Sequence, residues 1–171
     1  IFSVPTSDYL LGCKIDVKGA FKRLRIKRSE YPYALFSNAG KWFFSKTLPM
    51  GMKASPYLWV RFNSILLRLT KRLFQDRFHA SLMYIDDTLF AFEQATFSLS
   101  IAVTLLFLRL CGVPLSWKKL EAGTRVNWVG FRLNFEERRA YLSEVRLEKI
   151  RLQMSHILAL NRIPLTDFRS L

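Results

Sequence analysis

Residues 81–92 read SLMYIDDTLFAF, two short apolar runs interrupted by the adjacent acids Asp86 and Asp87. Apolar runs of this length on either side of a polar pair indicate a β-hairpin with the acids at its turn. Neighbouring carboxylates repel each other and apolar flanks withhold solvating water, so the pair needs a compensating cation. Asp is also common in turns, and taken alone the pair is explained equally well as an ordinary polar turn.

A third acid comes from a different part of the chain. Residues 10–17 form a short, mostly apolar run with Asp16 near its end, which predicts a buried strand with an acid at its exit. If this strand pairs with the hairpin, Asp16, Asp86 and Asp87 converge on one sheet edge. Carboxylates on rigid strands suit Mg²⁺, and two such ions can clamp an in-line phosphoryl transfer between a 3′-hydroxyl and a departing pyrophosphate. The acids therefore predict a site for two Mg²⁺ ions, with Mn²⁺ as the alternative.

The remaining segments alternate between strand-like and helical patterns. Aromatic stretches around a turn predict a second hairpin, and apolar residues at helical spacing predict helices. The expected elements are strands at 31–36 and 42–47 around a turn at 37–40, helices at 57–74 and 96–110, a strand at 126–133 and a helix capped by Ser143. This order predicts an α+β fold, an antiparallel sheet with helices packed on one face.

The balance of charge favours an anionic partner. Among the 171 residues, 27 Lys and Arg against 13 Asp and Glu give a formal net charge of +14. A basic surface gains affinity for nucleic acid by releasing counterions from the phosphate backbone. A solubilising surface, or a basic binding protein without chemistry, would show the same excess, so charge alone does not separate these classes.

The cysteines and histidines predict no metal centre. Cys13 and Cys111 lie far apart without a Cys-x-x-Cys pair, and His79 and His156 are isolated. We expect free thiols in a reducing intracellular compartment, since residues 1–5 are too short for a secretory signal, and nothing distinguishes cytoplasm from nucleus. We expect no membrane partner, because no apolar stretch is long enough to span a bilayer.

Five segments in the expected order give the chain a resemblance to reverse transcriptases. The matching segments are residues 15–21 (IDVKGAF, motif A), 48–56 (LPMGMKASP, motif B), 84–87 (YIDD, motif C), Gly112 with Lys118 and Lys119 (motif D) and 128–131 (WVGF, the motif E primer grip). The resemblance covers about residues 10–133. It implies a polymerase palm with partial fingers and the start of a thumb or connection.

The resemblance assigns the three acids to catalysis. It implies that Asp16 and Asp86 bind both metal ions together with the Val17 carbonyl, while Asp87 is the third carboxylate. It further implies that the primer strand lies against Tyr84, Trp128, Val129 and Gly130. Ordinary core packing is the alternative for Trp128.

The resemblance also implies a pocket for the incoming nucleotide. The backbone N–H groups of Gly19 and Ala20 would meet the triphosphate. Phe21 would lie against the sugar and exclude a 2′-hydroxyl, which selects dNTPs over rNTPs. Core packing is the commoner fate of a phenylalanine, and only its spacing from Asp16 favours the gate.

The far side of that pocket departs from the family pattern. Met50 and Gly51 would line it, where a glycine lets the backbone approach the substrate closely. Many relatives carry Gln at the position of Met50, although hepadnaviral polymerases share the LPMG form, and many carry an acid at the position of Gly19. Lys119, with Lys118 as its rival, would protonate the leaving pyrophosphate.

The motif variants are similar to those of particular retroelements. The LP-x-G and YIDD forms resemble LTR, DIRS-like and pararetroviral types, and residues 163–171 resemble the connector after the palm in hepadnaviral and DIRS-like enzymes. We expect residues 1–142 to form partial fingers and palm, and residues 143–171 to begin the thumb or connection. The chain would then belong to a larger polyprotein that supplies the missing fingers and thumb, with an RNase H domain as a further candidate.

The implied function is an RNA-directed DNA polymerase that adds dNTPs to a primer 3′-hydroxyl on an RNA or DNA template. The alternative is a catalytically inactive palm that only binds nucleic acid. An RNA-dependent RNA polymerase shares the palm plan, but Phe21 at the gate and Tyr84 before the acids argue against it. The presence of all three acids argues against an inactive palm, because burying a charged side chain that has no function costs folding free energy.

Overall fold

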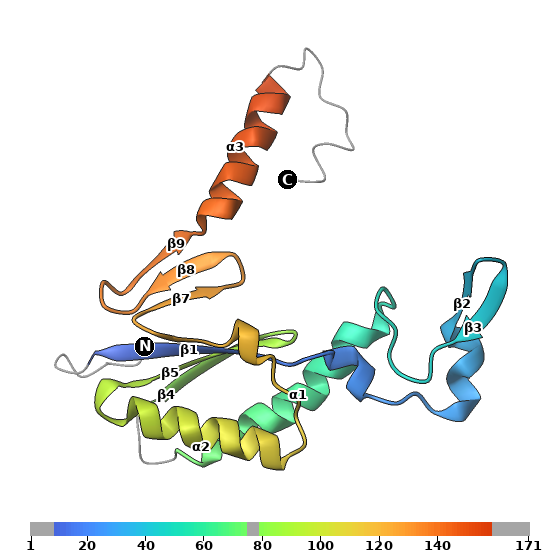
Figure 1. Ribbon diagram of the computed structural model, residues 1–171, viewed down its shortest axis with the longest axis horizontal. Helices are drawn as coiled ribbons and strands as arrows, with labels where there is room; N and C mark the ends of the chain where they lie inside the picture. The colour runs from blue at the N-terminus through green and yellow to red at the C-terminus, as the bar shows by residue number, and fades with distance from the viewer. Residues whose placement is uncertain (1–8, 75–78, 159–171) are drawn as a thin grey trace.

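The largest sheet of the molecule carries the three acids at one edge. The computed structural model describes residues 9–74 and 79–158. The sheet has four antiparallel strands in the order β4 (His79–Tyr84), β5 (Asp87–Glu93), β1 (Leu10–Asp16) and β6 (Glu121–Gly123) (Figure 1). The strand predicted at 10–17 and the hairpin predicted at 81–92 are confirmed.

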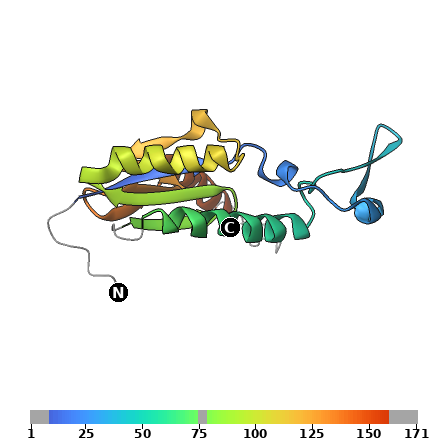
Figure 2. The ribbon, with the colours of Figure 1, turned by 90° about the horizontal axis from the view of Figure 1, so that it is seen from below.

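Two helices cover one face of this sheet, as the sequence predicts. Helix α1 (Ala54–Arg72) contacts β4 and α2 (Phe97–Leu110) contacts β5, and both lie on the same side in two perpendicular views (Figures 1 and 2). α1 begins at Ala54, earlier than the predicted 57. Pro56 is tolerated there because the first turn of a helix has no intrahelical partner for the N–H that proline lacks.

The core lies between the sheet and the helices. Alternate residues of β1 and β5 point at the helices, since successive strand residues face opposite sides of a sheet. The residues of this core that are at most 3% exposed are Cys13, Ile15, Trp59, Phe90 and Phe92. Both cysteines are free, as expected, and burial raises the pKa of the Cys13 thiol to about 12.

The face of α1 that is turned to the sheet is not its most apolar face. The buried residues of α1 are Ser55, Trp59, Asn63, Leu66 and Thr70. Six apolar residues at helical spacing mark the helix in the sequence. Leu66 among them is buried, but the other five are 41–56% exposed: Leu58, Phe62, Ile65, Leu69 and Leu73. Polar side chains therefore lie at the buried side of α1, close to the acidic turn.

A second sheet lies beside β1, on the side away from α1 and α2 (Figure 1). It has three antiparallel strands, β7 (Arg125–Trp128), β8 (Phe131–Asn134) and β9 (Arg139–Leu142). The single strand predicted at 126–133 is wrong, because Val129 and Gly130 both adopt a positive φ, of 49° and 78°, and reverse the chain. Two such residues form the tight turn that suits a twisted hairpin.

The chain then enters its last described helix. Helix α3 (Glu144–Leu158) starts directly after Ser143, where the sequence predicts it, and the Ser143 carbonyl accepts hydrogen bonds from the N–H groups of Arg146 and Leu147. The connector-like residues 163–171 lie outside the described residues. None of the described helices is both long and apolar enough to cross a membrane.

The second predicted hairpin projects away from the main sheet (Figure 1). Its strands are β2 (Leu35–Asn38) and β3 (Lys41–Phe44), joined by a turn in which Ala39 and Gly40 have positive φ. The strand predicted at 31–36 is wrong over 31–34, which belong to a 3₁₀ helix, Arg28–Ala34. Pro32 has no N–H to give to a strand ladder, so this segment suits a short helix better.

Three further 3₁₀ turns complete the described elements. They are Ala20–Arg23, Gln94–Thr96 and Trp117–Lys119. The turn at Ala20–Arg23 lies where the chain leaves the central sheet after β1, and the turn at Trp117–Lys119 lies where the chain re-enters that sheet before β6.

Candidate active site

The three acids meet where β1 and the β4–β5 hairpin come together. Asp16 is the last residue of β1 and lies directly opposite Asp87, the first residue of β5. Asp86 immediately precedes Asp87, in the turn between β4 and β5. Asp16 is 4% exposed, whereas Asp86 and Asp87 are half-buried. The convergence predicted from the sequence is therefore present, and its cause is the antiparallel register of β1 and β5.

The backbone around the acids is held from both sides. The Val17 N–H donates to the Asp86 carbonyl at 3.4 Å, and the Ser116 N–H donates to the Asp16 carbonyl at 2.9 Å. Across the turn, the Ile85 carbonyl accepts hydrogen bonds from the side chains of Trp59 and Asn63 on α1. Sequence reasoning missed these two residues, although a polar residue one turn after a tryptophan in an amphipathic helix was a usable signal.

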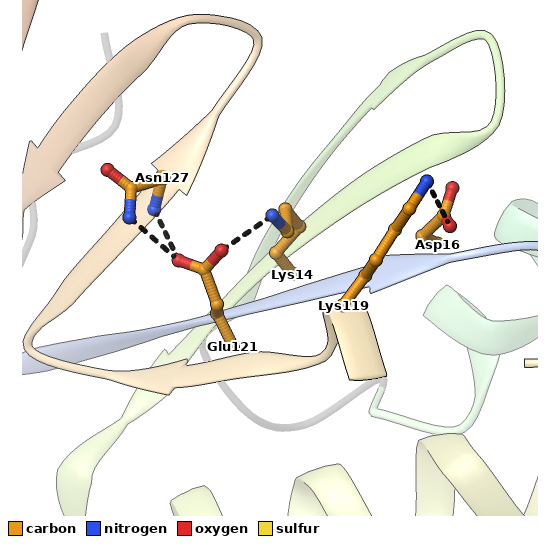
Figure 3. A network of polar contacts seen from close by, with 5 residues as sticks. All are labelled: Lys14, Asp16, Lys119, Glu121 and Asn127. Atoms are coloured by element: carbon orange, nitrogen blue, oxygen red, sulfur yellow. Dashed lines mark hydrogen bonds and ion pairs between the residues drawn. The ribbon is translucent and has the colours of Figure 1, made fainter. Parts of the chain in front are cut away.

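The electrostatics of the site are those of crowded negative charge. Burial raises the pKa of Asp87, and the neighbouring Asp16 and Asp86 carboxylates raise it further, while Lys14 and Lys119 act in the opposite direction. The Lys119 ammonium lies 3.0 Å from Asp16 Oδ2 (Figure 3). This hydrogen bond and the charge of Asp16 raise the pKa of Lys119. Of the two rival lysines, Lys119 is the one that reaches an acid.

The donor set suits a hard cation, although no complete metal-binding cluster is formed. Carboxylate and carbonyl oxygens are the ligands that Mg²⁺ prefers, and the raised pKa of Asp87 shows that the three carboxylates interact. Within residues 9–74 and 79–158, however, no group of three His, Cys, Asp or Glu side chains is arranged to hold a metal ion. The predicted two-metal site therefore stays a prediction.

A cavity of about 360 Å³ opens beside Asp16 and Asp86. The other residues predicted for the nucleotide that line it are Val17, Gly19, Ala20, Phe21, Met50 and Lys119. Gly51, which follows Met50 in the chain, and Asp87, which follows Asp86, are not among the lining residues. Phe21 both lines the cavity and packs against the hydrophobic core, so its position fits both interpretations and the gate stays a prediction.

The residues predicted to contact the primer lie apart from that cavity. Tyr84 ends β4 and is 55% exposed, whereas Trp128, Val129 and Gly130 form the β7–β8 turn. The Trp128 indole nitrogen is buried and has no hydrogen-bond partner within the described part of the chain. A buried tryptophan usually has a partner for its N–H. The unpartnered N–H of Trp128 is compatible with both core packing and the primer contact, so both stay predictions.

One polar network ties the β7–β8 hairpin to the strand that carries Asp16. Glu121 on β6 accepts a hydrogen bond from Lys14 Nζ at 2.7 Å, and from the backbone N–H and Nδ2 of Asn127 at 2.8 and 3.1 Å (Figure 3). Lys14 lies two residues before Asp16, on the same side of β1. The sequence offered no signal for this network, because Lys14 on β1 lies 107 residues before Glu121 on β6.

Comparison with known proteins identifies a family. The family model described as "Reverse transcriptase (RNA-dependent DNA polymerase)" matches residues 4–133. No curated protein gives a significant match.

Solved structures with a similar fold include a foamy viral protease-reverse transcriptase. Its complex with an RNA/DNA hybrid has a TM-score of 0.67 at 23% identity, over 82% of this chain and 18% of that chain. A complex of its dRH form with double-stranded DNA has a TM-score of 0.70 at 21% identity, over 94% and 26%. Another complex with double-stranded DNA has a TM-score of 0.68 at 21% identity, over 94% and 31%. This chain therefore spans less than a third of those polypeptides.

The family match and the fold agree. The matched residues contain β1, the β4–β5 hairpin, both covering helices and all three acids. The chain therefore belongs to the reverse transcriptase family of RNA-dependent DNA polymerases and has the α+β palm fold of that family.

Proposed function

We propose that this chain is the catalytic core of an RNA-directed DNA polymerase that adds dNTPs to a primer 3′-hydroxyl. The observation that carries the proposal is the pairing of Asp16 with Asp87, with Asp86 beside them, next to a cavity of about 360 Å³ that Asp16 and Asp86 line. Crowded carboxylates next to an open cavity are arranged to bind cations and to stabilise charge that develops on phosphate.

The metal ligands would be the side chains of Asp16, Asp86 and Asp87 and the carbonyl of Val17. When bound, two Mg²⁺ ions would supply the positive charge that activates the primer 3′-hydroxyl and neutralises the departing pyrophosphate. The Asp87 pKa, raised by burial and by its two neighbours, supports this assignment because added positive charge would relieve the repulsion.

The chain's own residues would orient the nucleotide. The backbone N–H groups of Gly19 and Ala20 would bind the triphosphate, and the ring of Phe21 would exclude a 2′-hydroxyl from the cavity it lines. Lys119 Nζ would hold the proton that the leaving pyrophosphate takes up. Its position at the same cavity and its contact with Asp16 support this role.

The nucleic acid would be bound by the surfaces around the cavity. Tyr84 and the turn at Trp128, Val129 and Gly130 would position the primer strand. The foamy viral relatives are complexed with an RNA/DNA hybrid and with double-stranded DNA, which supports a primer-template duplex as the partner. Residues 1–142 would be partial fingers and palm and residues 143–171 the start of a thumb or connection, within a retrotransposon or pararetrovirus-like polyprotein.

A second candidate function is a nucleic-acid scaffold without catalysis. Two observations favour it. Lys119 already neutralises Asp16, and the described residues hold no three-acid metal cluster. Met50 in place of the common Gln would also remove a polar contact to the nucleotide.

The deciding experiment is dNTP incorporation on a primed RNA template with Mg²⁺, using the complete open reading frame that contains this chain. Asp86→Asn keeps the size of the side chain but removes its charge, and we expect it to lower kcat by about 10³-fold or more. Glu136→Gln, at an exposed glutamate after β8, is the matched control and retains activity.

The outcomes separate the two functions. Incorporation that Asp86→Asn abolishes and Glu136→Gln does not, with rNTPs excluded, establishes the polymerase. A folded protein that binds primer-template but incorporates no dNTP supports the scaffold instead.

A further inference from the structure

Two buried polar side chains of α1 are directed at one carbonyl in the acidic turn. Trp59 is 1% exposed and Asn63 is 5% exposed, and they lie one helical turn apart on the same face of α1. The Trp59 indole N–H donates to the Ile85 carbonyl at 3.0 Å, and Asn63 Nδ2 donates to the same oxygen at 3.3 Å. Both lone pairs of that carbonyl are thus used by side chains from a different element.

The residue that owns this carbonyl is in an unfavourable backbone conformation. Ile85 has a φ of 53°, in the left-handed region. For a β-branched residue this is a real outlier, because Cβ crowds the carbonyl that follows it. Such a conformation persists only where the surrounding structure holds it, and it is found most often at functional sites.

The same carbonyl is part of the peptide unit that leads into Asp86. Fixing the oxygen fixes the plane of that peptide, because the peptide bond is planar. The following peptide is fixed from the opposite side, where the Asp86 carbonyl accepts a hydrogen bond from the Val17 N–H at 3.4 Å. The Cα of Asp86 therefore lies between two anchored peptide planes, one held by α1 and one by the strand that carries Asp16.

Packing alone does not explain why Asn63 lies on the buried face of α1. Burying an amide costs free energy unless it is hydrogen-bonded, and an apolar side chain would pack against the sheet without that cost. Thr70 is also buried on this face, and its hydroxyl is satisfied within α1 itself, since it donates to the Leu66 carbonyl. Asn63 instead reaches out of the helix to the turn.

We propose that Trp59 and Asn63 are positioning residues that hold Ile85 in its left-handed conformation and thereby set the position of the Asp86 carboxylate. This inference rests on the proposed function of Asp86. It adds a requirement that lies outside residues 84–87 themselves, namely two side-chain donors that α1 contributes.

The first test removes one donor without removing its volume. Asn63→Leu is close in size and cannot donate, so we expect kcat for dNTP incorporation to fall by about 10- to 100-fold with KM for the dNTP changed less than about threefold. Thr70→Val is the matched control, because it removes a buried polar group from the same face of α1 without touching the turn. It retains the kcat of the parent enzyme.

The second test distinguishes positioning from helix packing. Glycine adopts a φ near 53° without strain, so Ile85→Gly removes the need for an anchor. We expect Asn63→Leu to lower kcat at least about threefold less in the Ile85→Gly background than in the parent. An equal loss of kcat in both backgrounds overturns the proposal, because an effect of Asn63 on helix packing alone would not depend on the residue at position 85.

The third test does not depend on activity. Exchange of the four tryptophan indole N–H groups is followed by nuclear magnetic resonance on the unliganded protein. We expect the Trp59 indole N–H to exchange at least about 10²-fold more slowly than that of exposed Trp42. Fast exchange at Trp59 overturns the anchor whatever the activity. A protected Trp59 in a protein that incorporates no dNTP leaves the anchor standing and refutes the proposed function alone.

Discussion

At the scale of single residues, Phe21 occupies a position that fits both a core role and the proposed gate. Phe21 packs against the core and is also one of the residues that line the cavity beside Asp16. This packing fixes the ring, and a fixed ring is what a steric filter requires, since a mobile one would move aside for a 2′-hydroxyl. Core packing of Phe21 is therefore compatible with the gate that we propose.

Shortening this side chain should relax the choice of sugar. Phe21→Val removes most of the ring, and we expect the ratio of kcat/KM for a dNTP over the matching rNTP to fall by about 10-fold or more. The measurement is steady-state incorporation of both nucleotides opposite one template base. Phe36→Val, at a half-exposed phenylalanine of β2, is the control and should leave the ratio unchanged. An unaltered ratio in Phe21→Val would leave the ring with its packing role alone.

At the scale of elements, the Lys14–Glu121–Asn127 network joins the β7–β8 hairpin to β1. Burial raises the pKa of Glu121, but the hydrogen bonds from Lys14 and Asn127 outweigh it and hold that pKa below its usual 4.5. A lowered pKa in the folded state means that the ionised form stabilises the fold. This contribution is present above pH 4.5 and is lost as the pH falls through and below that value.

Removing the charge of Glu121 should therefore have a pH-dependent effect. Glu121→Gln lowers the Tm at pH 7, and the difference from the parent narrows as the pH is taken below 4.5. Thermal unfolding between pH 3 and pH 7 provides the measurement, with Glu136→Gln as an exposed control. A Tm difference that is the same at every pH would mean that the network gains nothing from the ionised carboxylate.

The β7–β8 turn offers a second prediction at this scale. Val129 has a φ of 49°, which is costly for a β-branched residue, whereas Asn followed by Gly is the favoured pair for such a turn. Val129→Asn should raise the free energy of unfolding by about 0.5–2 kcal/mol. Denaturant unfolding tests this, and primer-template affinity measured on the same variant shows whether the turn also contacts the primer. A loss of stability would contradict the strain argument.

At the scale of the whole molecule, we expect charge to govern the proposed association with nucleic acid. The net charge is +14, and Lys27 and Arg28 are among the exposed basic residues between β1 and the projecting β2–β3 hairpin. We expect primer-template affinity to fall by about 10²-fold or more between 50 and 200 mM salt. Replacing both residues with Gln should reduce the slope of log Kd against log salt by about two. A slope that does not change would place the nucleic acid elsewhere on the surface.

The local features of the fold were predictable because they depend on neighbours in the chain. The apolar runs around Asp86 and Asp87 predicted β4 and β5, and helical spacing predicted α1 and α2. The predictions failed where one residue overrides a pattern: Pro32 ends a strand-like run, and Val129 with Gly130 reverses the chain within another. The spacing of apolar residues in α1 also identified a helix, but within the stripe from Leu58 to Leu73, Leu66 alone is buried.

The sequence by itself determined which residues are the candidates for the proposed chemistry: three acids, a phenylalanine five residues after the first of them, and a lysine pair. Only the tertiary structure decided how they are arranged. It placed Asp16 opposite Asp87, selected Lys119 over Lys118, and brought Trp59 and Asn63 to the Ile85 carbonyl. The reason is physical: motif residues are recognised by spacing along one segment, whereas register, ion pairing and anchoring depend on segments that meet only when the sheet and helices have packed.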